Sequence, residues 1–382
     1  MLVYVLAATL TFPAALDRAI HARGAAEHYE QQAEALESFS FRKLPSVRAE
    51  TGFSSADDLN LITQNVTRVD AFTALVTVDY PLLGHQPTLR GDAQLLRQRA
   101  DQEAEEVFRE TLDAFARLYL ADARLELLRA TMERAGSLRE RAQTLLTAGA
   151  ISNTTAAQWV DQALAAESML VDFQLQRLDA ETRLKQLMGD ASDEPLHVVI
   201  AAGGTPALQT AVGTPASRRL DGRRLAAEFA LKDALALRKP QLMMSAFGGV
   251  ANVTDGTFGL YGLRFTLSLP MFDAATARRV AQARLEAEDA ERASALEAQA
   301  GKNRAALLRV AMAAADKRIA LLTQAVDVAK QREESVTRLV RAGVRAEGDL
   351  VDVASDVSRR ESDLLTVRVE RWKLEQQLRW EP

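Results

Sequence analysis

Two carboxylates near the C-terminus have a spacing that could support electrostatic chemistry. Asp349 and Asp352 lie three residues apart in the sequence AGVRAEGDLVD, shortly after Gly343, where a helix is expected to begin. Residues i and i+3 share one helix face, so the two charges would point the same way. Spacing alone favours capping and dipole stabilisation of the helix N-terminus. The alternative is a site that attracts cations.

Other side chains offer little reactive chemistry. The chain has no cysteine, which excludes disulfides, thiolate metal sites, cysteine nucleophiles and cysteine-linked lipid anchors. Of the four histidines, only His21 and His28 lie close together, and a solvated helix face explains them better than a metal site. The segment AAGGTP lacks the spacing of a phosphate-binding loop. We therefore expect no enzyme, no metal and no cofactor.

The composition is that of a folded, helix-rich protein. The 382 residues are 48% hydrophobic and 26% charged, with only 5% aromatic. A net charge of −5 gives no basic surface for nucleic acid. The apolar run Met1–Leu10 has the character of a signal peptide but lacks a basic start. No stretch approaches the roughly 20 apolar residues of a membrane helix, so strands would have to do any spanning.

The sequence repeats itself at an offset of about 190 residues, half of its length. The matching pairs are Arg42–Phe53 with Arg238–Gly249, Val76–His85 with Phe265–Ala274, and Leu145–Thr155 with Leu339–Asp349. We predict a first structural repeat over 1–189, a Gly- and Pro-rich connector over 190–221, and a second repeat over 222–382.

Each repeat contains two stretches in which apolar and polar residues alternate, which is typical of strands with one apolar face. The four predicted strands are Ser46–Ser54, Phe72–Tyr80, Leu242–Val250 and Tyr261–Leu269. A tight turn is expected at Asn252–Gly256, and a longer polar loop near Asp57–Asn65.

Each strand pair precedes a very long helical pattern. The segments Leu83–Ala148 and Asp273–Ala342 have apolar residues at steps of three and four, and 66 residues of helix would span roughly 100 Å. Gly149 and Gly343 are expected to end these helices as C-caps, and a returning helix follows each.

Proline marks both expected junctions between strand and helix. Pro81 and Pro270 hold matched positions in the two repeats, after a strand and before a long helix. Because proline has no N–H to extend a strand ladder, we predict that each one stops its strand and redirects the chain.

This arrangement resembles the TolC-like outer-membrane efflux proteins over nearly the whole chain, Leu10–Trp380. The supporting motifs are LPSV at Leu44–Val47, DYPLL at Asp79–Leu83, SLPMFDAA at Ser268–Ala275, and the turns at Gly149 and Gly343. The resemblance implies a mainly α fold with a small β part. The chain would be a duplicated long-helix protomer of an α-barrel, and its four strands would contribute to a trimeric, twelve-stranded transmembrane β-barrel.

The resemblance also implies a role and partners. The protein would be the outer-membrane channel of a tripartite efflux or type I secretion system, with passive export through its pore. It would form a homotrimer in outer-membrane lipid, with most of its mass in the periplasm. A periplasmic adaptor and an inner-membrane pump would be its partners.

Three residues match the family's periplasmic gate. Asp349 and Asp352 correspond, by their distance from Gly343, to the acidic pair that lines the aperture. Arg345 resembles a basic residue that ties neighbouring helices together. The acidic partner of that arginine would fall near Thr155, which cannot form an ion pair.

Two structural alternatives remain open at this stage. A long coiled-coil scaffold explains the helices but not two alternating hairpins at equivalent positions. A periplasmic adaptor has a helical hairpin but needs long β-rich flanking domains. The sequence does not identify the cargo, which could be drugs, metals or polypeptides.

Overall fold

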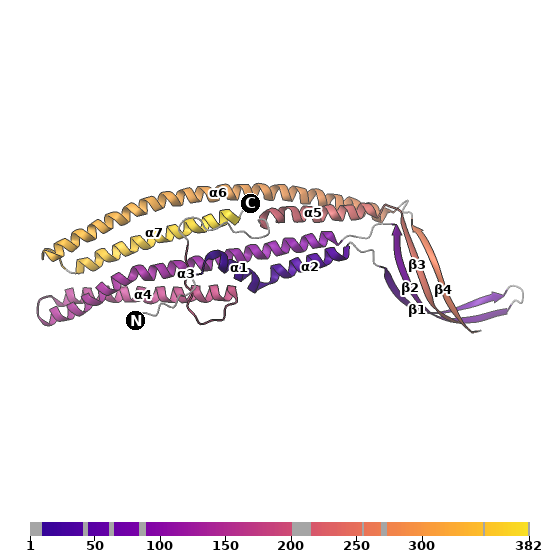
Figure 1. The fold of residues 1–382 in the computed structure, drawn as a ribbon, viewed down its shortest axis with the longest axis horizontal. Helices are drawn as coiled ribbons and strands as arrows, with labels where there is room; N and C mark the ends of the chain where they lie inside the picture. The colour runs from indigo at the N-terminus through magenta and orange to yellow at the C-terminus, as the bar shows by residue number, and fades with distance from the viewer. Residues whose placement is uncertain are drawn as a thin grey trace. The chain divides into compact units, whose positions relative to one another are not determined.

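The computed structural model describes residues 10–40, 45–60, 65–83, 89–200, 215–253, 256–268, 273–346 and 348–380. The helices are α1 (Phe12–Arg23), α2 (Ala25–Ser40), α3 (Arg90–Thr147), α4 (Asn153–Met188), α5 (Pro215–Ala236), α6 (Ala274–Arg341) and α7 (Gly348–Trp380). The strands are β1 (Ser46–Asn60), β2 (Asn65–Leu83), β3 (Gln241–Val253) and β4 (Gly256–Ser268). The predicted order of elements is confirmed (Figure 1). The division at residues 189 and 221 stays a prediction.

The chain falls into two compact units that each combine segments from both halves of the sequence. Unit 1 comprises Met1–His28, Arg99–Arg219 and Glu297–Pro382, and unit 2 comprises Tyr29–Gln98 and Leu220–Leu296. Unit 1 is mainly helical in its described residues, and unit 2 contains the sheet. No helix in the described ranges has both the length and the apolar composition needed to cross a membrane.

Glycines end the two long helices, as predicted. Gly149 and Gly343 have φ values of 67° and 71°, the left-handed conformation that a side chain would disfavour. After α3, the Gly149 N–H donates to the Leu146 carbonyl at 3.0 Å and the Ala150 N–H donates to the Leu145 carbonyl at 2.9 Å. This pairing satisfies carbonyls that the helix end would otherwise leave open.

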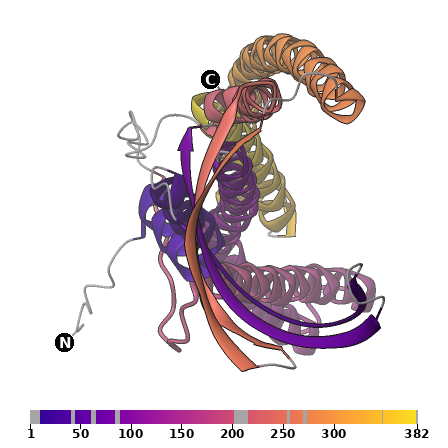
Figure 2. The same cartoon turned by 90° about the vertical axis from the view of Figure 1, so that its right-hand side faces the viewer.

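The four strands form one antiparallel sheet in the order β1-β2-β3-β4. Figure 2 shows them twisting and curving side by side. The first hairpin has a shorter loop than the sequence predicts, because the β1–β2 ladder continues to the pair Asn60↔Asn65. The residues between β3 and β4, where the tight turn is expected, lie outside the described ranges.

The prolines do not both occupy the predicted place. β2 passes through Pro81 and ends at Leu83, with a register shift against β3 between these two residues. Pro81 therefore lies inside the last residues of the strand and does not end it. An irregular ladder tolerates a residue without an N–H, which explains its position. Pro270 lies outside the described residues.

Aromatic side chains form the centre of the unit 1 core. Phe12 of α1 meets Phe108, Phe115 and Trp372 edge to face, with ring centroids 5.8, 5.7 and 5.5 Å apart. Trp380 stacks on Phe108 at 4.2 Å. These contacts join the N-terminal helix to α3 and α7, so segments distant in the sequence share one core.

A buried carboxylate fixes the start of the connector to α4. Glu181 is only 5% exposed, and its Oε1 accepts from the Leu196 backbone N–H at 2.9 Å. Arg177 donates to Glu181 at 2.7 Å and to the Leu196 carbonyl at 3.2 Å. Burial raises the pKa of Glu181, but the Leu196 N–H, Lys185 and Arg177 outweigh it, so the pKa is lowered overall.

We predict that Glu181 makes the fold sensitive to acid. A lowered folded-state pKa adds stability above the unfolded pKa, and this stability is lost as the pH falls through the folded pKa. Glu181→Gln should lower the melting temperature at pH 7 and flatten its decline below about pH 4.5. Thermal unfolding by circular dichroism at several pH values measures both effects. A decline as steep as that of the unmodified protein would contradict the assignment.

Candidate functional site

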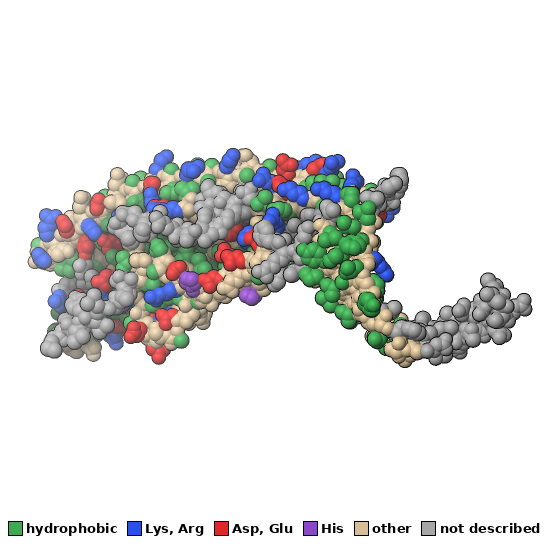
Figure 3. All heavy atoms as spheres, turned by 45° about the vertical axis from the view of Figure 1, so that its right-hand side comes forward, with side chains coloured by type: hydrophobic (Ala, Val, Ile, Leu, Met, Phe, Trp, Pro, Cys, Tyr) green, Lys and Arg blue, Asp and Glu red, His purple; other side chains and the backbone are tan. Residues whose placement is uncertain are grey.

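The sheet in unit 2 has two chemically distinct faces. The pairs Val47↔Val78, Val76↔Gly248 and Ala246↔Leu263 put alternate residues of all four strands on one face. Its exposed apolar side chains include Val47, Phe72, Val76, Val250, Tyr261, Leu263, Phe265 and Leu267. Figure 3 shows hydrophobic side chains gathered over the strands.

Large apolar side chains on this face are mostly exposed, which is unfavourable in water. Tyr261 is 87% exposed, and Leu263 and Phe265 are 65% and 61% exposed. Large contiguous apolar patches are rare on soluble monomers and mark sites that contact lipid or protein. The face is therefore a candidate interaction surface.

The opposite face carries polar side chains between apolar ones such as Leu75 and Phe247, and hydrogen bonds connect its strands. Asp79 of β2 is 8% exposed and accepts from the Ser245 hydroxyl of β3 at 2.5 Å. Arg48 of β1 lies 3.7 Å from the other carboxylate oxygen. One buried carboxylate thus links three strands and has partners on both sides, as a buried charge requires.

Close packing also shapes this polar face. The Phe247 ring lies against Gly262 of the paired strand, where an added Cβ would come within 2.7 Å of the ring. The Arg264 guanidinium lies 5.7 Å from the Phe247 ring centre, a cation–π distance. Gly262 is therefore needed where an aromatic ring covers the strand backbone.

The second candidate site is the pair of helix turns in unit 1. At the first turn, Ser152 caps α4 by accepting from the Thr155 backbone N–H at 3.1 Å. The hydroxyls of Ser152 and Thr155 lie 2.9 Å apart. Thr155, where the sequence lacks an acidic gate partner, is thus engaged in a local cap.

At the second turn, the predicted gate residues lie at the start of α7. Asp349 is in the first turn, and the Arg345 guanidinium lies 3.5 Å from its carboxylate. The described partner of Arg345 is therefore in its own turn, and a tie to a neighbouring helix stays a prediction. Asp352 points elsewhere, because its Oδ1 accepts from Gln162 Nε2 of α4 at 2.6 Å.

A tryptophan joins the two turns beside this hydrogen bond. Trp159 of α4 is 7% exposed and packs in a cluster with Ala142 and Val351. A Cβ added to Gly348 would come within 2.4 Å of the Trp159 indole nitrogen. Only glycine at the start of α7 allows this close approach. Trp159, Gln162 and Gly348 connect α4 to α7 near the predicted gate.

Sequence reasoning missed these three residues. Trp159 carried a signal, because it is one of only three tryptophans in the chain and follows the predicted turn at Gly149. No sequence pattern marks Gln162 or Gly348, since their importance depends on which helices meet in space.

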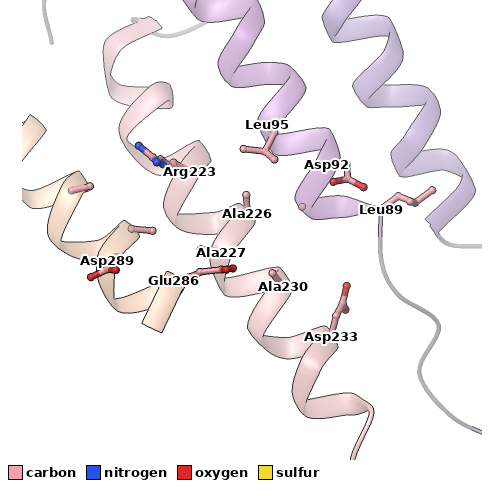
Figure 4. A pocket seen from close by; sticks show the side chains of 13 residues that line it. Leu89, Asp92, Leu95, Arg223, Ala226, Ala227, Ala230, Asp233, Glu286 and Asp289 are labelled. Carbon is pink, nitrogen blue, oxygen red and sulfur yellow. The ribbon is translucent and has the colours of Figure 1, made fainter. Parts of the chain in front are cut away.

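A cavity of about 720 Å³ lies between α3, α5 and α6 in unit 2 (Figure 4). Alanines line much of it, with Asp92, Asp233, Glu286 and Asp289 as its carboxylates and Arg223 as its cation. No hydroxyl, thiol or imidazole belongs to this described lining, so it lacks a nucleophile paired with a base. Among the described residues no cluster of three or more metal-ligating side chains occurs.

Comparison with known proteins finds a match in fold. No family model matches the chain, and no curated protein matches its sequence. The CmeC outer-membrane channel of Campylobacter jejuni aligns with a TM-score of 0.74 at 13% identity, over 95% of this chain and 84% of CmeC. The outer-membrane channel OprN aligns at 0.70 and 16%, over 96% and 91%. VceC of Vibrio cholerae aligns at 0.69 and 16%, over 97% and 94%.

At this identity the likeness shows the fold. The chain has the fold of the TolC-like outer-membrane channels, as the motifs predict: mainly α, with long helices and a small antiparallel sheet. The match covers both units, including the two-faced sheet.

We predict that the two sheet faces respond oppositely to charge. Phe265→Arg should reduce the amount of folded, membrane-extracted protein, because it places a charge on the apolar face, and a charge that faces lipid near the bilayer midplane costs roughly 2–4 kcal/mol. Phe265→Leu should be mild, and Thr266→Arg on the polar face should be tolerated. Fractionation and gel mobility before and after heating measure the folded amount. A greater loss of folded protein with Thr266→Arg than with Phe265→Arg would show that the two faces are assigned the wrong way round.

Proposed function

We propose that the chain is one protomer of a trimeric outer-membrane channel that exports substrates passively in a tripartite efflux or type I secretion system. The observation that carries the proposal is the bare apolar face of a four-stranded sheet within a fold shared with outer-membrane channels. The apolar face suits lipid, and the polar face suits a water-filled lumen. A periplasmic adaptor and an inner-membrane pump are the proposed partners.

The number of strands supports a trimer. Bacterial barrels of this kind need at least about 8 strands, and the described residues of one chain form one sheet of four strands. Three copies supply twelve. The apolar faces of the sheets would then meet lipid on the outside of the barrel, and the long helices would lie in the periplasm.

The helices carry further surfaces that suit contact between copies. On α6 the exposed apolar residues Leu285, Leu296, Leu307, Val310, Leu321, Val328 and Leu339 fall within about 60° of one another at 100° per residue. On α4 the residues Leu164, Val171, Leu175 and Leu178 form a stripe of similar width. We name these the α6 stripe and the α4 stripe.

Two different stripes on one chain favour a ring. A surface that meets a different surface on the next copy makes a head-to-tail contact, and such contacts form a closed ring when the rotation is right. In a closed ring, the α6 stripe of each copy would pack against the α4 stripe of the next copy, so every stripe would be buried.

We predict that the α6 stripe holds the ring together. The unmodified protein should have the mass of three chains in mild detergent, and Leu321→Lys should shift it towards monomer. Ala320→Lys, an exposed site about 100° around the helix, is the matched control. Light scattering after size-exclusion chromatography measures the mass. A stable monomer of the unmodified protein would defeat the trimer.

We predict that Asp349 and Asp352 attract cations at the pore aperture. Three copies would place six carboxylates there, a field that salt should screen. Asp349→Ala with Asp352→Ala should lower cation selectivity and abolish block by multivalent cations, without changing trimer yield. Single-channel recording in planar bilayers tests this. Unchanged selectivity and block would mean that both residues only cap the helix. A protein that forms no pores would contradict the proposed channel function.

A further inference from the structure

A groove of about 540 Å³ runs between α3, α4 and α7 within unit 1. Its lining follows α4 from Gln162 to Phe173 and α7 from Val351 to Asp363. Eleven residues of helix correspond to roughly 16 Å. The groove is therefore long enough for an extended organic molecule, and α3 supplies its third wall.

The floor of the groove is apolar. Ala165 and Ala166 leave room along α4, and Met169 is 54% exposed although it belongs to this lining. Leu127 and Leu128 of α3 add further apolar surface. A concave apolar surface with a few polar groups at its margin is the usual character of a small-molecule site.

One end of the groove carries an unpaired negative charge. Asp352 accepts from Gln162 through Oδ1. No lysine or arginine in the described part of the chain forms an ion pair with it. A carboxylate has about four acceptor positions, so Oδ2 can accept from a ligand while Oδ1 keeps its contact with Gln162.

The other end carries Arg124 together with Asp363, which also belongs to the lining. Arg124 donates to the Ser362 and Thr366 hydroxyls, each at 3.1 Å, and lies 5.6 Å from the Phe173 ring centre. Burial lowers the pKa of Arg124 and Asp363 counteracts this, yet a guanidinium remains charged at neutral pH. With Asp363 beside it, this end has no net charge that would draw a cation.

A third carboxylate on the wall is already neutralised. Asp356 pairs with Arg359 at 2.8 Å and with Arg360 at 3.0 Å. Asp352 is therefore the lining carboxylate best placed to hold an added cation at the end remote from Arg124.

We propose that this groove binds an amphipathic organic monocation, with its ammonium group at Asp352 and its apolar, preferably aromatic, body along Met169 towards Phe173. Charge complementarity sets the orientation, because Asp352 gives its end of the groove a net negative charge, whereas Arg124 and Asp363 offset each other at the far end. The inference does not depend on the channel role, since all its residues belong to one chain.

The groove is separate from the α4 stripe. At 100° per residue, Met169 lies about 140° around α4 from Leu164, so the stripe and the groove occupy different sides of the helix. A neighbouring copy that covers the stripe would leave the groove to a ligand.

Calorimetric titration of the full chain in detergent tests the proposal. The probe is protonated 4-phenylbutylamine. Two controls separate its features: 4-phenylbutanol lacks the charge and butylamine lacks the ring. The proposal expects saturable binding of the probe at one site per chain and much weaker binding of every control. Equal binding of the alcohol or of butylamine would overturn it.

Two substitutions locate the site. Asp352→Asn keeps an acceptor for Gln162 but removes the charge, and it should weaken binding about tenfold, the equivalent of about 1.4 kcal/mol. Met169→Lys should abolish binding, whereas Met169→Leu should preserve it. Asp172→Asn removes a charge from an exposed α4 position outside the lining and should have no effect. If Asp172→Asn weakens binding as much as Asp352→Asn, general electrostatic attraction explains the titration and the site is refuted.

Discussion

A four-stranded antiparallel sheet that is open at both edges and has one uncovered apolar face leaves peptide groups unpaired and apolar surface exposed. The rest of the structure depends on how this surface is covered. Within the described chain, β1 and β4 each have a neighbour on one side only. Their outer edges present unpaired peptide groups, and the apolar face is left open. In the proposed trimer, joining sheets edge to edge across copies would meet both needs together, because the ladder would close and the apolar face would turn outwards to lipid. Closure of this kind requires several copies of the chain.

The long helices follow the same logic. A single chain packs Phe12, Phe108, Phe115, Trp372 and Trp380 into one core. Much of α6, by contrast, presents an apolar stripe of exposed side chains. A helix of 68 residues is far too long to be buried in a compact domain. In the proposed ring of copies its stripe would become an interface, so the exposed leucines of the helices and those of the sheet would have one explanation.

Local patterns predicted most of the fold, and spatial neighbours limited the prediction. Alternation located all four strands and their faces, and Gly149 and Gly343 fixed the helix ends, because these features depend on adjacent residues. The place of Pro81 within β2 depends on a register shift against β3, which no local pattern contains. The partners of Asp352 were missed for the same reason, since Gln162 is 190 residues away in the sequence.

The contact between α4 and α7 has an energetic feature that fits a proposed gate. Gln162 donates to Asp352, but its buried Oε1 has no hydrogen-bond partner in the described structure. A buried acceptor without a partner costs roughly 1–3 kcal/mol, which offsets much of what a hydrogen bond to a charged group contributes. The amide cannot rotate to relieve this, because its oxygen would then face the carboxylate. The contact is therefore specific in geometry but weak in net energy, as a contact must be if opening the aperture is to break it.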